Sequence, residues 1–159
     1  MAEQNVIAWK QPLGDPACPY AFRWVLNLGI VAFRLHKWVG SDDPRYMHDH
    51  PYWFFTFVLK GSYDDVTDAG VEPMPRWTIR FRRATHKHTV KLTSPVCWTF
   101  LISGMQVRKW GFWIGEKFFR AEKFFAKIGH HPCETVTDGE HKEDATGQSV
   151  GLSESRSHH

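Results

Sequence analysis

The residues best suited to chemistry are histidines that recur at alternate positions. His48 and His50 flank Asp49 just before Pro51, where the chain enters an apolar run. In an extended chain, alternate side chains share one face and their Cα atoms lie about 6.5–7 Å apart, so the two imidazoles converge. Neutral imidazole is a ligand for iron, zinc, copper and nickel. This pair predicts two of the ligands of a divalent metal ion.

A third ligand has to come from a strand that is adjacent in space. The segment at 83–90 carries His86 and His88, again at alternate positions. His88 is the candidate for the third ligand. His86 shares its face and is the alternative.

Further polar side chains are candidates for the wall of a pocket. His36 lies on a preceding predicted strand, and Tyr63 follows a glycine turn, where it could bond to a metal ligand. Any of Arg80, Arg82 and Arg108 that points inward would bind a carboxylate or phosphate through two parallel hydrogen bonds.

The elements that must position these residues are short strands. Runs rich in aromatic and β-branched residues alternate with breaks of Gly, Pro, Ser and Asp, which is typical of an antiparallel sandwich or barrel. We therefore predict an all-β fold, with the barrel at about 22–113. The expected strands are 22–28, 30–38, 53–59, 77–82, 89–92, 98–102 and 107–113. The run at 52–59 is apolar on both faces, which predicts a central strand covered by a second layer.

The segment at 116–128 is predicted to be a helix. Phe118, Ala121, Phe125 and Ile128 form an apolar stripe, and basic residues form another, as in an amphipathic helix packed on a β core.

The chain of 159 residues is expected to form one domain, at 1–132, followed by a tail. All 24 aromatic residues lie at or before Phe125. The tail at 133–159 has none, so it cannot bury enough apolar surface to offset its chain entropy and is predicted to be disordered. Residues 134–159 carry a net charge of −4, which leaves +7 on the rest. A basic body favours anionic partners.

Composition also predicts where the protein works. We find no apolar run near 18 residues and no basic leader, so we expect neither a membrane span nor a secretory signal. Three cysteines without a CxxC spacing predict neither a disulfide framework nor a cysteine zinc site, and favour a reducing cytoplasm. The basic run at 76–91 matches no nucleic-acid motif, so nucleic acid is not an expected partner.

A series of motifs in a fixed order resembles the cupin superfamily. His48-x-His50 is followed eleven residues later by Gly61, and then by the segment that ends at His88. More narrowly, the run His48-Asp49-His50-Pro51 and the residues after it resemble small metal-binding cupins of bacteria and bacteriophages. The resemblance covers about residues 23–113. It implies a double-stranded β-helix, or jelly-roll, barrel that binds a divalent metal through His48, His50 and His88.

One position departs from the usual cupin pattern. Cupins commonly place a glutamate ligand four residues after the second histidine, where this chain has Phe54. The resemblance then implies a three-histidine site without carboxylate, as in the thiol-dioxygenase branch. Three neutral ligands leave the charge of the cation uncompensated in an apolar cavity, so we expect the site to recruit an anion.

The function expected is that of an Fe(II)-dependent oxygenase, or dioxygenase, acting on a small anionic substrate. Three ligands leave positions open for substrate and O2, and aromatic walls exclude water. Zinc, manganese and nickel are the alternative metals. The alternative functions are a metal-dependent isomerase or lyase of a sugar or keto acid, and a non-catalytic phage accessory protein that binds a small anion or nucleotide. The resemblance also implies a homodimer in the cytoplasm of a bacterial or phage-infected cell.

Overall fold

The structure is a computed structural model that describes residues 7–129, so the predicted tail at 133–159 lies outside the described residues. Its strands in chain order are β1 (Ile7–Asp15), β2 (Cys18–Asn27), β3 (Ala32–Trp38), β4 (Met47–His48), β5 (Phe54–Lys60), β6 (Tyr63–Thr67), β7 (Gly70–Met74), β8 (Ile79–Arg82), β9 (Thr89–Leu92), β10 (Cys97–Ser103), β11 (Gly111–Ile114) and β12 (Lys117–Arg120). The helix α1 (Ala121–Ile128) follows.

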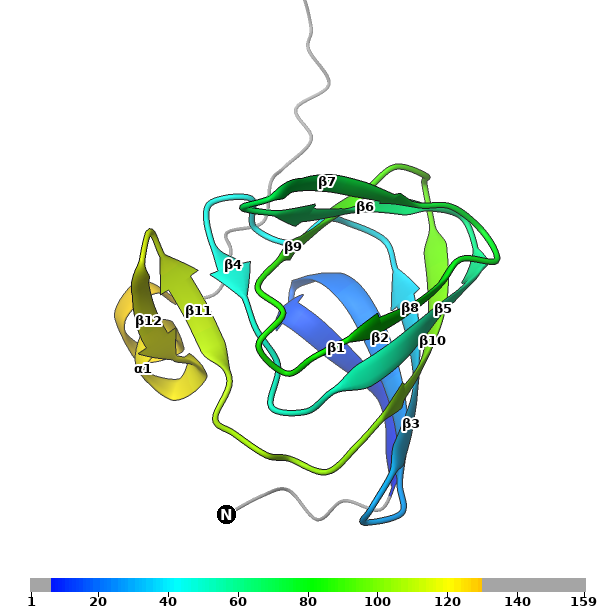
Figure 1. The fold of residues 1–159 in the computed structure, drawn as a ribbon, viewed down its shortest axis with the longest axis horizontal. Coiled ribbons are helices and arrows are strands. Elements are labelled where there is room, and N and C mark those ends of the chain that lie inside the picture. The colour runs from blue at the N-terminus through cyan, green and yellow to red at the C-terminus, as the bar shows by residue number, and fades with distance from the viewer. Residues whose placement is uncertain (1–6, 130–159) are drawn as a thin grey trace, which may run out of the picture.

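These strands form three antiparallel sheets, and the fold is an all-β jelly roll with a C-terminal helix. The largest sheet has six strands in the order β1-β2-β3-β10-β5-β8, and two three-stranded sheets have the orders β7-β6-β9 and β12-β11-β4. Figure 1 shows β6 and β7 across the top of the six-stranded sheet, and the β11–β12 hairpin with α1 at the left. The core lies between the first two sheets, and its buried members are Ala21, Trp38, Val58, Tyr63, Met74, Val90 and Cys97.

Strands β3 and β10 have the clearest alternation of buried and exposed residues. They pair along their whole length, and in both strands every second residue is buried. Because side chains alternate across a strand, this period of two gives the sheet an inner and an outer face. The inner face of β3 carries Arg34 and His36. Two charged or titratable side chains therefore point into the barrel.

The outer face of the six-stranded sheet is almost entirely apolar. In the strand register its apolar members are Phe22, Trp24, Leu26, Phe33, Leu35, Phe55, Phe57, Ile79, Phe81, Trp98, Phe100 and Ile102, all partly or fully exposed, and its charged members are Lys37 and, opposite Trp98, Lys60. Among residues 7–129, no second layer of this chain covers these side chains. This corrects the prediction for 52–59, because β5 is central within its sheet yet Phe55 is 38% exposed.

Several boundaries differ from the predicted ones. The helix begins at Ala121 and not at 116, because residues 117–120 pair with β11 in a hairpin. Strand β1 extends the large sheet before residue 22, although Lys10 and Gly14, both with positive φ, break its pattern. Strands β6 and β7 form a hairpin whose aspartates are more typical of a turn.

Gly61, the motif glycine, makes the turn from β5 into β6. Its φ is 73°, and a Cβ at this position would clash with the carbonyl oxygen of Val96. Glycine is therefore required here by both the backbone conformation and the close approach.

Two further expectations concern the cysteines and the membrane. Cys97 is free and buried, whereas Cys18 is disulfide-bonded, which corrects the expectation drawn from the cysteine count. Within the described part of the chain, the structure has no helix long and apolar enough to cross a membrane.

Candidate metal centre

The backbone places His48 directly opposite His88. The His48 N–H donates to the His88 carbonyl at 2.8 Å, and the His88 N–H donates to the His48 carbonyl at 2.9 Å, which makes an isolated antiparallel bridge. Residues opposite each other in such a pair project their side chains to the same face, with Cβ atoms about 5 Å apart. Accordingly, the two ring centroids lie 4.7 Å apart.

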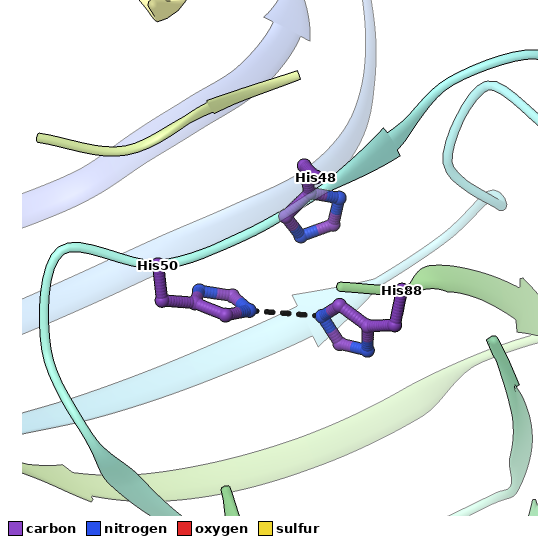
Figure 2. A group of neighbouring side chains, drawn as sticks. All are labelled: His48, His50 and His88. Carbon is purple, nitrogen blue, oxygen red and sulfur yellow. Dashed lines mark hydrogen bonds between the residues drawn. The ribbon is translucent and has the colours of Figure 1, made fainter. Parts of the chain in front are cut away.

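His50 completes a triangle with these two rings. His50 is two residues beyond His48 in the chain. The ring centroid of His50 lies 5.1 Å from that of His48 and 5.0 Å from that of His88. Figure 2 shows the three rings converging, with Nε2 of His50 and Nε2 of His88 2.9 Å apart. Two ligands at right angles on one metal, with bonds of about 2.1 Å, are separated by about 3 Å. The triangle therefore fits a single divalent cation, and its ligand atoms all lie within 4.8 Å of one another.

The protonation states also suit a metal. Burial, reinforced by the neighbouring His88, holds the pKa values of His48 and His50 well below their ordinary value, so both rings are neutral. Nδ1 of His88 lies 2.7 Å from a carboxylate oxygen of Asp65. Because that oxygen can only accept, Nδ1 carries the proton and Nε2 keeps its lone pair for a metal.

Carboxylates behind the ligands supply charge that the sequence did not lead us to expect. Asp65 lies behind His88, and Oδ2 of Asp42 lies 3.6 Å from Nδ1 of His48. Both carboxylates are buried. Burial raises the pKa of Asp42 to about 6, so this group is mostly ionised at neutral pH. The charge of a cation is therefore offset in part by these two residues.

Asp65 joins His88 to a second group of potential ligands. Its carboxylate also accepts from Arg82 at 2.7 and 3.0 Å and lies 3.0 Å from Nε2 of His86. Burial raises the pKa of Asp65, but the hydrogen bonds from His86 and His88 outweigh it and hold that pKa well below its usual range. Asp65, His86 and His88 are close enough to hold a metal, yet their polar atoms already satisfy one another.

The three candidate arginines, Arg80, Arg82 and Arg108, are not among the residues that line the cavity. Arg80 and Arg82 both pair with Glu72, and Arg82 also pairs with Asp65. Arg108 pairs with Asp49, the residue between the two motif histidines. Each of the three guanidinium groups therefore has a carboxylate partner of its own.

Asp49 serves the fold on the side opposite to His48 and His50. Besides Arg108, it accepts from the Gly111 backbone N–H at 3.0 Å and from Nε1 of Trp113 at 3.2 Å. It thereby ties the histidine motif to β11.

One cavity of about 940 Å³ includes the histidine triangle and the predicted pocket residues His36 and Tyr63. Phe54 forms part of its wall, with its ring edge-on to His50 at 4.6 Å, and cannot ligate. Burial raises the pKa of Tyr63, so its phenol stays protonated.

Arg23 and Arg34 also line this cavity, and sequence reasoning missed both. The signal was available for Arg34, because it lies two residues before His36 on the same strand face.

Solved structures with related folds are found at low sequence identity. An RmlC-like cupin protein from Ralstonia eutropha is 13% identical, with a TM-score of 0.52 over 74% of this chain and 73% of that protein. The polyketide cyclase RemF from Streptomyces resistomycificus is 12% identical, with a TM-score of 0.54 over 80% and 92%. AerE from Microcystis aeruginosa is 16% identical, with a TM-score of 0.48, and the match spans 60% of this chain and 46% of AerE.

Identities this low establish the fold and no more. No protein-family model and no curated protein matches the sequence.

Proposed function

This chain has the cupin fold, and from that premise we propose that it is a metal-dependent enzyme acting on a small anionic molecule. The observation that carries the proposal is the triangle of the His48, His50 and His88 imidazoles in the wall of the cavity. His48, His50 and His88 hold the metal ion. The remaining space of the 940 Å³ cavity receives the substrate.

Fe(II) is the metal we propose, because three nitrogen ligands without carboxylate leave positions for substrate and O2. When bound, Fe(II) supplies oxygen activation, whereas zinc, manganese or nickel in the same ligands supply Lewis-acid chemistry for an isomerase or lyase.

The protein's own residues prepare the site. Asp65 fixes the tautomer of His88 through the 2.7 Å contact to Nδ1. Phe54 packs against His50 and excludes water from that side.

Oxygen consumption tests this function. Protein reconstituted with Fe(II) without oxygen is mixed with small carboxylates, phosphates and thiols, and O2 uptake is recorded on admission of air. We expect uptake with a carboxylate in wild type and in His86→Ala, and none in His48→Ala. Absence of uptake with every compound would reject the oxygenase and leave the Lewis-acid enzyme or the non-catalytic binding protein. Equal uptake in His48→Ala would reject the metal site.

We also propose that two copies pack through the outer face. Its twelve apolar side chains are all partly or fully exposed, and a stable interface of standard size buries about 800 Å² of each partner. A second copy brings the same apolar face, so a two-fold contact buries both. Two lysines lie over rings of this face: the Lys37 ammonium lies 5.9 Å from the ring centroid of Trp98, and the Lys10 ammonium lies 5.5 Å from that of Phe22.

Phe100→Glu tests this dimer, because Phe100 lies near the middle of the outer face, 6.1 Å from both Phe33 and Phe57. The mass in solution, measured by light scattering, is expected to fall from dimer to monomer. Val71→Glu is the control, since Val71 is 58% exposed on the separate β6–β7 hairpin. A wild-type monomer, or a Phe100→Glu dimer, would contradict the proposal.

A further inference from the structure

We propose that Arg34 and His36, supported by Arg23, form a carboxylate-binding subsite in the wall of the cavity. This subsite holds the anionic end of the substrate while the histidine triangle faces its other end. Only the description of the ligand as a substrate rests on the proposed function. The contacts that make up the subsite do not involve the metal ligands.

The three side chains lie together on the inner face of two paired strands. His36 on β3 is directly opposite Arg23 on β2, and Arg34 is the next inward residue of β3. Arg34 is 9% exposed and His36 is 8% exposed. All three line the cavity. Two guanidinium groups and one imidazole are thus gathered at one place inside the barrel.

These guanidinium groups have only neutral partners. Nη1 of Arg34 donates to Oγ of Ser103, and its guanidinium stacks over the ring of Tyr52 at 4.1 Å. Arg23 donates through Nε and Nη2 to Oε1 of Gln11. No ion pair within residues 7–129 includes Arg23 or Arg34, in contrast to Arg82 and Arg108, which have buried carboxylates.

A buried cation without an anion is costly. Burial, together with the nearby Arg23, lowers the pKa of Arg34. An anion bound beside Arg34 removes this cost.

His36 provides an independent observation. Both of its ring nitrogens are buried and have no hydrogen-bond partner. A neutral imidazole carries one N–H donor, and leaving such a donor buried without an acceptor costs about 1–3 kcal/mol. An oxygen of a carboxylate between His36 and Arg34 would accept from both residues.

We choose a carboxylate because it needs only one guanidinium, and Gln11 already holds the Nε and Nη2 edge of Arg23. Arg34 donates through Nη1 to Ser103 and also forms a side-chain hydrogen bond with Tyr52, which leaves its remaining N–H donors for a ligand. A planar carboxylate with a single charge matches one guanidinium fork. A doubly charged phosphate would need a second fork.

The distance to the metal centre limits the size of the substrate. The guanidinium of Arg34 lies 4.1 Å from the ring of Tyr52, and that ring lies 6.4 Å from the ring of His50. Arg34 is therefore no farther from His50 than the sum of these two distances. A small organic acid spans such a gap and places a second polar group at the histidines.

Acetate titration into metal-free protein tests the subsite without the metal. Wild type is compared with Arg34→Gln and with the control Arg83→Gln, which alters an exposed arginine outside the cavity. We expect Arg34→Gln to bind acetate about ten- to a hundredfold more weakly, as loss of a hydrogen bond to a charged group implies, and Arg83→Gln to bind as wild type does. Arg34→Lys, which keeps the charge but loses the fork, should also bind more weakly.

Nitrogen-15 NMR of the histidine rings gives a readout that needs no variant. Acetate should shift the His36 ring signals of wild type. Equal acetate affinity in wild type and Arg34→Gln, an unmoved His36 signal at saturating acetate, or tighter binding of inorganic phosphate than of acetate would each overturn the carboxylate subsite.

Metal content separates this inference from the proposed function. Arg34→Gln should retain as much metal as wild type, because Arg34 contacts none of the three histidines. If the protein binds acetate through Arg34 but retains no metal, the carboxylate subsite is supported and the proposed metal-dependent enzyme is rejected.

Discussion

Replacing Asp65 by asparagine should weaken metal binding without changing any ligand. Asp65 accepts a hydrogen bond from Nδ1 of His88 at 2.7 Å. Nε2 of His88, which lies next to Nε2 of His50, therefore carries a lone pair. If the asparagine amide faces His88, Nδ1 has to accept instead, and the proton moves to Nε2. Loss of such a partner typically lowers metal affinity ten- to a hundredfold, which is about 1.4–2.8 kcal/mol.

The assay is competition for the metal with a chromogenic chelator, with thermal unfolding measured in parallel. Glu72→Gln is the matched control, since Glu72 shares Arg82 with Asp65 but does not contact His88. We expect Glu72→Gln to bind metal as tightly as wild type does. An unchanged affinity in Asp65→Asn, or an equal loss in both variants, would refute the assignment of Asp65 as the residue that orients His88.

Two further predictions concern stability. Burial lowers the pKa of His36 to about 3, whereas an unfolded histidine titrates near 6.5, so the unfolded state binds the extra proton between these values. In carboxylate-free buffer, the free energy of unfolding should therefore fall as pH falls from 6.5 towards 3. Urea titrations measure this slope, and His36→Gln should reduce it by up to about 1.4 kcal/mol per pH unit. The same slope in both proteins would contradict the burial of His36. Arg108→Met should lower the free energy of unfolding by about 3 kcal/mol at neutral pH, because Asp49 is then buried without its cation, and the metal content should be retained. Arg45→Met is the control and should change the free energy of unfolding little, because Arg45 pairs with Asp43 at the surface.

The strands that could be predicted from sequence are those whose apolar residues alternate. Thr89–Leu92 is predicted with its observed bounds, and the predicted run at 98–102 lies within β10. Strand β6 could not be found in this way, because Asp64 and Asp65 favour a turn. The structure forms a strand there because Asp65 has Arg82, His86 and His88 as partners from other elements. Such tertiary partners are absent from a local pattern.

The histidine positions followed from the same alternation, whereas the charges around them did not. Spacing alone indicates that His48 and His50 share a face, but not that Asp42 and Asp65 lie behind the ligands. Arg34 was missed because an arginine on an apolar strand ordinarily faces solvent. Arg34 faces the interior because alternate residues of β3 share one face, and His36 lies on that same inner face.

The central claim, that His48, His50 and His88 bind one divalent cation together, is tested most directly by metal stoichiometry. Wild type and single alanine variants of the three histidines are purified without added metal, loaded with Fe(II) without oxygen or with Zn²⁺, dialysed and analysed for metal per chain. The account predicts about one ion per chain in wild type and in His86→Ala, and a loss of most of the metal in each of the three variants, as expected when a ligand of a three-ligand site is removed. Two results would contradict this claim and place the ion at Asp65 and His86 instead. The first is that His50→Ala retains the metal. The second is that His86→Ala loses the metal while His88→Ala retains it.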